Sequence, residues 1–127
     1  MKKTFLSLLA ALSMGGLLLS AQTIKNPEEG KYSISTGDVT LTVDAAKGGK
    51  VVSFKYQDKE VLSQTRFPNS FGSTFWTSPQ SEWNWPPVAE YDRNPFTAEV
   101  KGNTLILTSA KSERFGYRIR KDRKSVV

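Results

Sequence analysis

Residues 39–62 read VTLTVDAAKGGKVVSFKYQDKEVL, and the pattern in this stretch decides the fold. Apolar and polar residues alternate over 39–43 and again over 52–56. Alternation with a period of two is typical of β-strands that bury one face. The glycine pair at 48–49 permits the positive φ angles that a tight turn requires. The stretch therefore predicts consecutive antiparallel strands.

The same alternation extends in both directions from this stretch. A short strand is expected around Tyr32 and Ile34, and two more are expected over residues 96–100 and 105–107. The Gly-Asn pair between these last two is typical of a two-residue hairpin turn. No segment after Gln22 shows helical periodicity. The chain is therefore predicted to be all-β, with an antiparallel β-sandwich as the expected arrangement.

The last alternating run is expected to be a strand with a basic face. Phe115, Tyr117 and Ile119 would lie on one side, and three arginines would lie on the other: Arg114, Arg118 and Arg120. Such a face would suit an acidic polysaccharide. The favoured interpretation is a solvated outer face, because basic side chains commonly protect an edge strand from pairing with other chains.

The N-terminus has the pattern of an export signal. Lys2 and Lys3 precede an apolar run over residues 5–19, and a small residue stands at Ala21. We therefore expect a signal peptide over residues 1–21 and a periplasmic or secreted protein. The apolar run is shorter than the ~20 residues of a membrane-spanning helix, so the mature form is expected outside the membrane. The chain contains no cysteine, which excludes disulfides and thiolate metal sites.

Residues 71–96 read FGSTFWTSPQSEWNWPPVAEYDRNPF and contain all three tryptophans and four of the six prolines. Proline disfavours central strands and continuous helices, so a long ordered loop is predicted. Indole rings beside polar side chains suit a sugar, whose C–H faces pack on rings while its hydroxyls bond to polar groups. The expected stacking residues are Trp76, Trp83 and Trp85, and the expected hydroxyl contacts are Gln80, Glu82 and Asn84. An equally weighted alternative is that the rings close the open end of the core.

The acids of this loop are Glu82, Glu90 and Asp92. Glycoside hydrolysis requires two carboxylates placed on either side of the scissile bond. Loop acids are more often solvated or paired with a basic neighbour, so the catalytic residues stay unassigned. No metal site or cofactor is expected. No nucleic-acid partner is expected either, because the aromatic residues lie among acids rather than among basic residues.

Two segments carry a family resemblance. Residues 48–62 (GGKVVSFKYQDKEVL) and 71–87 (FGSTFWTSPQSEWNWPP) resemble the galactose mutarotase-like superfamily, in an exported bacterial branch. The resemblance implies a large antiparallel β-sandwich that binds carbohydrate, of which this chain would be the N-terminal part. Mutarotases use a histidine and a glutamate for proton transfer. This chain has no histidine, so no catalytic residue is carried over.

The expected organisation follows from these segments. Residues 22–30 are expected to be a linker, residues 31–121 a partial β-sandwich domain, and residues 122–127 a non-native tail. The last six residues read DRKSVV, which matches one reading frame of a common sequencing adapter; a natural basic tail is the alternative.

The expected function is an exported carbohydrate-binding protein. One alternative is a sugar epimerase or glycosidase-associated enzyme whose catalytic residues lie in a missing C-terminal part. Another is a structural envelope protein.

Overall fold

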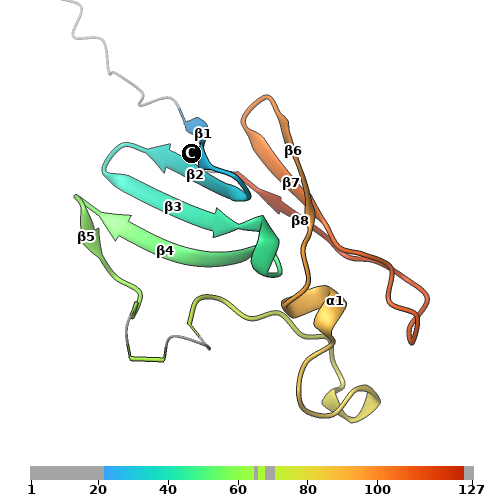
Figure 1. Ribbon diagram of the computed structural model, residues 1–127. Coiled ribbons are helices and arrows are strands. Elements are labelled where there is room, and N and C mark those ends of the chain that lie inside the picture. The colour runs from blue at the N-terminus through green and yellow to red at the C-terminus, as the bar shows by residue number, and fades with distance from the viewer. Residues whose placement is uncertain (1–21, 65, 68–70, 125–127) are drawn as a thin grey trace, which may run out of the picture.

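The computed structural model describes residues 22–64, 66–67 and 71–124. The expected signal peptide, and residues 125–127 of the expected tail, lie outside the described residues. Two antiparallel sheets are the main regular structure of the described chain (Figure 1). The strands are β1 (Thr23–Glu28), β2 (Lys31–Thr36), β3 (Val39–Asp44), β4 (Lys50–Tyr56), β5 (Lys59–Glu60), β6 (Thr97–Lys101), β7 (Thr104–Thr108) and β8 (Arg120–Arg123).

The first sheet is a meander in which β1 to β5 lie in chain order. Ile34 of β2 lies opposite Leu41 of β3, which in turn lies opposite Phe54 of β4. These cross-strand neighbours form an apolar row on one face, as the alternation predicts. The strands predicted within residues 39–62 are confirmed, although β5 is only two residues long.

The register of β4 differs from simple alternation. Val52 and Phe54 are expected on the same face, but a bulge shifts the pairing so that Val51 lies opposite Val43. Val51 consequently packs against the core, and Val52 is buried on the opposite face of the sheet. One extra residue in a strand reverses the side-chain alternation beyond it, which is the physical reason for the difference.

The expected linker over residues 22–30 is wrong for most of its length, because it contains β1. This strand pairs with β2, and Ile24 packs against the hydrophobic core. Its register is irregular between Lys25 and Glu28, and Pro27 lies within that irregular part. Proline is tolerated in an edge strand or a bulge, so the polar Asn-Pro-Glu segment does not prevent pairing.

The second sheet has the order β6-β7-β8. The predicted hairpin is confirmed: β6 and β7 are joined through Gly102, which has a φ of 57°, and Asn103. The strand expected over residues 115–119 is wrong. Gly116 has a φ of 74°, and its N–H donates to the Ser112 carbonyl, so this segment forms a turn. The strand begins only at Arg120, and it continues past the expected domain end at Lys121.

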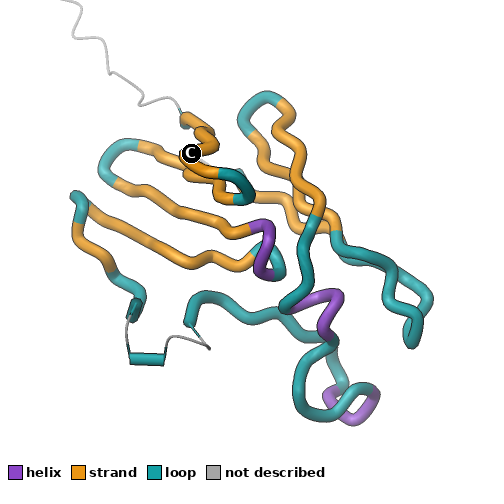
Figure 2. The backbone as a smooth tube through the Cα atoms, in the orientation of Figure 1, coloured by secondary structure: helices purple, strands orange, loops and turns teal. Residues whose placement is uncertain are grey.

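Both sheets contribute to one hydrophobic core. Ile34, Val43 and Ala45 come from the first sheet and the turn that follows β3. They pack with three residues on or beside the second sheet, which are Phe96, Leu105 and Leu107. The all-β class is confirmed, since the described helical segments are only a few residues long (Figure 2). The face-to-face sandwich arrangement stays a prediction.

The turn between β3 and β4 packs against the short helix α1 (Ala89–Asp92). The Gly48 N–H donates to the Asn94 carbonyl at 3.1 Å. Lys121 of β8 completes this junction, because its Nζ donates to the carbonyl oxygens of Gly48 and Tyr91 at 2.8 and 3.3 Å. Burial lowers the pKa of Lys121 to about 8. One side chain thereby holds the turn, the helix and the second sheet together.

Candidate ligand groove

The aromatic loop brings its three tryptophans into one cluster. Trp76 lies between the other two, with ring centroids 6.1 Å from both Trp83 and Trp85. Trp83 is only 5% exposed, whereas Trp76 is 52% and Trp85 is 68% exposed. Of the three rings, only Trp83 is buried as the closure hypothesis requires, and it is not part of the hydrophobic core cluster described above. The other two rings present apolar surface to solvent.

Trp83 is held by the short helical turn that precedes it (Gln80–Glu82). Its indole N–H donates to the Thr77 carbonyl at 2.9 Å, which satisfies the one polar atom of the buried ring. The Arg114 guanidinium donates to the carbonyl oxygens of Trp83 and Glu82. Arg114 therefore anchors the loop, and the expected basic strand face is not formed.

Residues two positions apart would point to the same side in an extended segment, but Trp83 and Trp85 do not lie in such a segment. Asn84, between them, has a φ of 58° in the left-handed region. Asparagine tolerates this conformation better than most residues do. The chain direction changes at Asn84, so that Trp83 is buried while Trp85 stays exposed.

A groove of about 750 Å³ lies beside Trp76 and Trp85. This volume falls within the range of about 300–1,000 Å³ that is typical of small-molecule sites. Residues from β4, the turn before it, the aromatic loop and α1 contribute to its lining. The apolar lining residues are Val52, Phe71, Trp76, Trp85, Pro86 and Pro87. The polar lining residues are Lys47, Lys50, Thr74, Asp92 and Arg93.

Asp92 is the buried acid of this groove. Its carboxylate accepts hydrogen bonds from Lys50 Nζ at 3.0 and 3.1 Å, and from the Phe75 backbone N–H at 2.9 Å. The ion pair joins α1 to β4, and the third bond fixes the loop next to Trp76. The Asp92 carboxylate thus accepts three hydrogen bonds that hold the groove together.

The predicted site residues divide into three groups. Trp76 and Trp85 line the groove, and Trp83 supports Trp76 from within the loop. The residues expected to contact hydroxyls are exposed but do not line the groove, and these are Gln80, Glu82 and Asn84. Sequence reasoning missed the basic lining residues Lys47, Lys50 and Arg93. The available signal was two lysines that flank the Gly48-Gly49 turn, but no pattern linked that turn to the aromatic loop.

Of the three loop acids, only Asp92 lines the groove. The described lining therefore offers no second carboxylate with which Asp92 could form a catalytic pair. Among the described residues, no group of three or more potential metal-ligating side chains occurs. No helix in the described part of the chain has the length and apolar character needed to span a bilayer.

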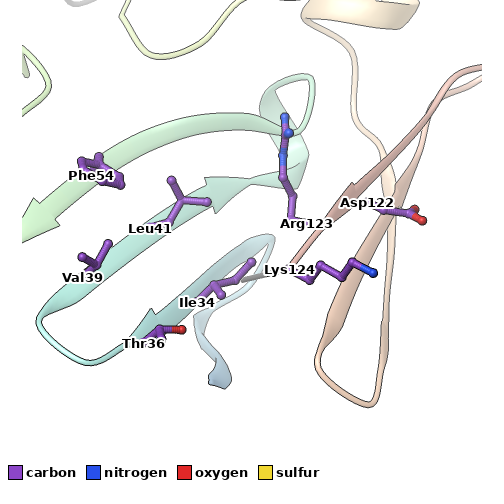
Figure 3. A pocket seen from close by; sticks show the side chains of 8 residues that line it. All are labelled: Ile34, Thr36, Val39, Leu41, Phe54, Asp122, Arg123 and Lys124. Atoms are coloured by element: carbon purple, nitrogen blue, oxygen red, sulfur yellow. The ribbon is translucent and has the colours of Figure 1, made fainter. Parts of the chain in front are cut away.

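A second pocket of about 400 Å³ lies on the apolar row of the first sheet (Figure 3). Ile34, Leu41 and Phe54 form part of its floor. Arg123 and Asp122 of β8 also line it; Arg123 reaches along the sheet, while Asp122 points away from it. None of the tryptophans contributes to this pocket.

Comparison of the chain with protein-family models, curated proteins and solved structures found no match. The resemblance to galactose mutarotase-like domains therefore stays a prediction.

Proposed function

We propose that this chain is an exported carbohydrate-binding protein with a galactose mutarotase-like domain, and that the groove beside Trp76 and Trp85 is its sugar site. The observation that carries the proposal is the exposure of these two rings at the groove, with their centroids 6.1 Å apart. Large exposed apolar patches on soluble proteins commonly mark binding sites.

The geometry of the rings supports sugar binding in particular. Trp76 and Trp85 meet edge to face, with an interplanar angle of 73°. Each ring can therefore offer a flat surface in a different direction, and an extended saccharide can contact both. Trp83 packs against Trp76 from the buried side and limits the movement of that ring. A rigid aromatic surface loses little conformational entropy on binding.

The polar lining supplies the remaining requirement of a sugar site. The Thr74 hydroxyl and the cationic groups of Lys47 and Arg93 lie in the same groove as the rings. Sugar hydroxyls both donate and accept hydrogen bonds, so a groove with a hydroxyl and two cationic donors suits them. The support is for binding, since the described lining provides no acid–base pair for catalysis.

The test is a glycan-binding experiment with matched variants. All three tryptophans lie in the aromatic loop, so intrinsic fluorescence reports on this region directly. We expect binding of at least one polysaccharide class, and we expect Trp76→Ala and Trp85→Ala each to weaken it about tenfold, equivalent to about 1.4 kcal/mol. Tyr56→Ala removes a comparably exposed ring outside the groove and is the control.

The stability of the two tryptophan variants should stay close to that of the parent, because both rings are largely exposed. The proposal is wrong if a broad panel of neutral and acidic glycans shows no binding. It is also wrong if binding occurs but the tryptophan variants and Tyr56→Ala behave alike.

A further inference from the structure

We propose that the groove selects acidic sugars, and that Lys47 and Arg93 bind the carboxylate of a uronic acid residue. This inference rests on the proposed function and adds the class of ligand. It starts from the charges of the groove, whose lining contains three cationic side chains and one anionic side chain.

Lys50 and Asp92 neutralise each other. The two groups form an ion pair at 3.0 Å, and both are largely buried, with side-chain exposures of 15% and 7%. The Phe75 backbone N–H also donates a hydrogen bond to the Asp92 carboxylate. A ligand would have to break this buried pair to use either charge, and breaking such a pair is strongly unfavourable. The pair is therefore part of the framework of the groove.

Lys47 and Arg93 are different, because both are exposed and neither makes an ion pair with another described residue. They come from separate segments: Lys47 ends the helical turn after β3 (Ala45–Lys47), and Arg93 follows α1. The packing of Gly48 against Asp92 and Arg93 brings these segments together. The groove consequently presents two uncompensated positive charges in addition to the exposed rings.

Two cationic side chains beside two exposed indole rings suit a sugar ring that carries a negative charge. A guanidinium binds a carboxylate through two parallel hydrogen bonds, and an ammonium adds a point charge. A uronic acid has its carboxylate directly on the pyranose ring, so stacking and ion pairing can occur in one residue. A sulfated sugar also carries a negative charge, so the experiment includes both carboxylated and sulfated ligands.

The experiment compares each charged uronate with its uncharged ester. Trisaccharides of galacturonate, mannuronate and glucuronate are titrated against the chain, each beside its neutral methyl ester, together with a sulfated dextran oligosaccharide. Fluorescence of the tryptophans gives the affinity. We expect at least one uronate to bind, and its ester to bind at least tenfold more weakly. The difference should shrink as salt is raised.

The variants assign the effect to the two cations. Lys47→Gln and Arg93→Gln should each weaken binding of the uronate about five- to tenfold, and should leave binding of the ester unchanged. Arg118→Gln is the matched control, because it removes one exposed positive charge that does not line the groove. It should alter neither affinity.

Each contrary outcome has a distinct meaning. Equal binding of a uronate and its ester would overturn the selection for acidic sugars, while the proposed sugar site would stand. Binding of the sulfated oligosaccharide without any uronate would overturn the assignment to a carboxylate. An effect of Arg118→Gln as large as that of Arg93→Gln would show non-specific attraction instead. If neither these ligands nor neutral glycans bind, the inference and the proposed function both fail.

Discussion

Replacement of Gly48 by alanine tests the contact on which the groove depends. Gly48 has a φ of 71°, and a Cβ added to it would lie 1.9 Å from the Asp92 carbonyl oxygen and 2.4 Å from the Asp92 carbonyl carbon. Both of these atoms belong to the backbone of α1. A Cβ essentially never approaches another heavy atom within 3.0 Å, so the turn and α1 must separate by about an ångström.

The loss of folding stability in Gly48→Ala has two parts, and the matched variant Gly37→Ala separates them. A non-glycine residue in the left-handed region costs about 1–2 kcal/mol, and overpacking costs a further 1–3 kcal/mol. Gly37 also has a positive φ, 55°, but a Cβ added there meets no heavy atom within 4 Å. Gly37→Ala should therefore lose about 1 kcal/mol, and Gly48→Ala should lose about 3 kcal/mol or more.

Urea unfolding monitored by tryptophan fluorescence measures both variants. With a urea dependence of about 1.5 kcal/mol per molar, an extra loss of about 2 kcal/mol lowers the midpoint by about 1.3 M relative to Gly37→Ala. A complete failure of Gly48→Ala to fold, with Gly37→Ala folded, would agree with the prediction. Equal midpoints for the two variants would refute the packing of the turn against α1.

Three further predictions concern titration, the buried ion pair and catalysis. Because burial lowers the pKa of Lys121 from 10.5 to about 8, the unfolded chain binds a proton between these pH values that the folded chain does not. The free energy of unfolding of the parent chain, measured relative to that of Lys121→Met, should therefore rise as pH increases from about 8 to 10.5. A difference between the two proteins that does not change with pH would contradict the lowered pKa of Lys121. Asp92→Asn and Lys50→Met should each destabilise the fold by about 3 kcal/mol. The double variant should lose at least about 1 kcal/mol less stability than the sum of the two single losses. Single losses that add up in thermal or urea unfolding would show that the two side chains are not coupled. The chain should not accelerate the interconversion of α- and β-glucose, because it contains no histidine and the groove acid is engaged by Lys50. Polarimetry checks this, and a rate well above that of buffer would refute it.

Local pattern was sufficient to predict several features. The alternation over residues 39–43 predicts β3, and the glycines at 48–49 predict the turn after it, since both depend on near neighbours in the chain. The prolines of residues 71–96 predict the long irregular stretch for the same reason. The strand expected over residues 115–119 failed because the turn at Gly116 is stabilised from outside the segment. Tyr91 packs on Tyr117 at 5.4 Å and donates a hydrogen bond to its carbonyl.

The sequence by itself thus determined the all-β class, the order of β2 to β5 in the first meander and the aromatic character of the loop. These properties follow from side-chain periodicity and from the backbone limits of proline and glycine, which act over a few residues. Only the tertiary structure decided which tryptophans are exposed and which charges face them. Trp83 is buried and Trp85 is exposed because the chain direction changes at Asn84, which has a positive φ. Arg93 and Lys47 line one groove because Gly48 has no side chain to keep α1 away. Contacts between residues more than forty positions apart leave no periodic pattern in the sequence, so only the packing of the chain shows which side chains share the groove.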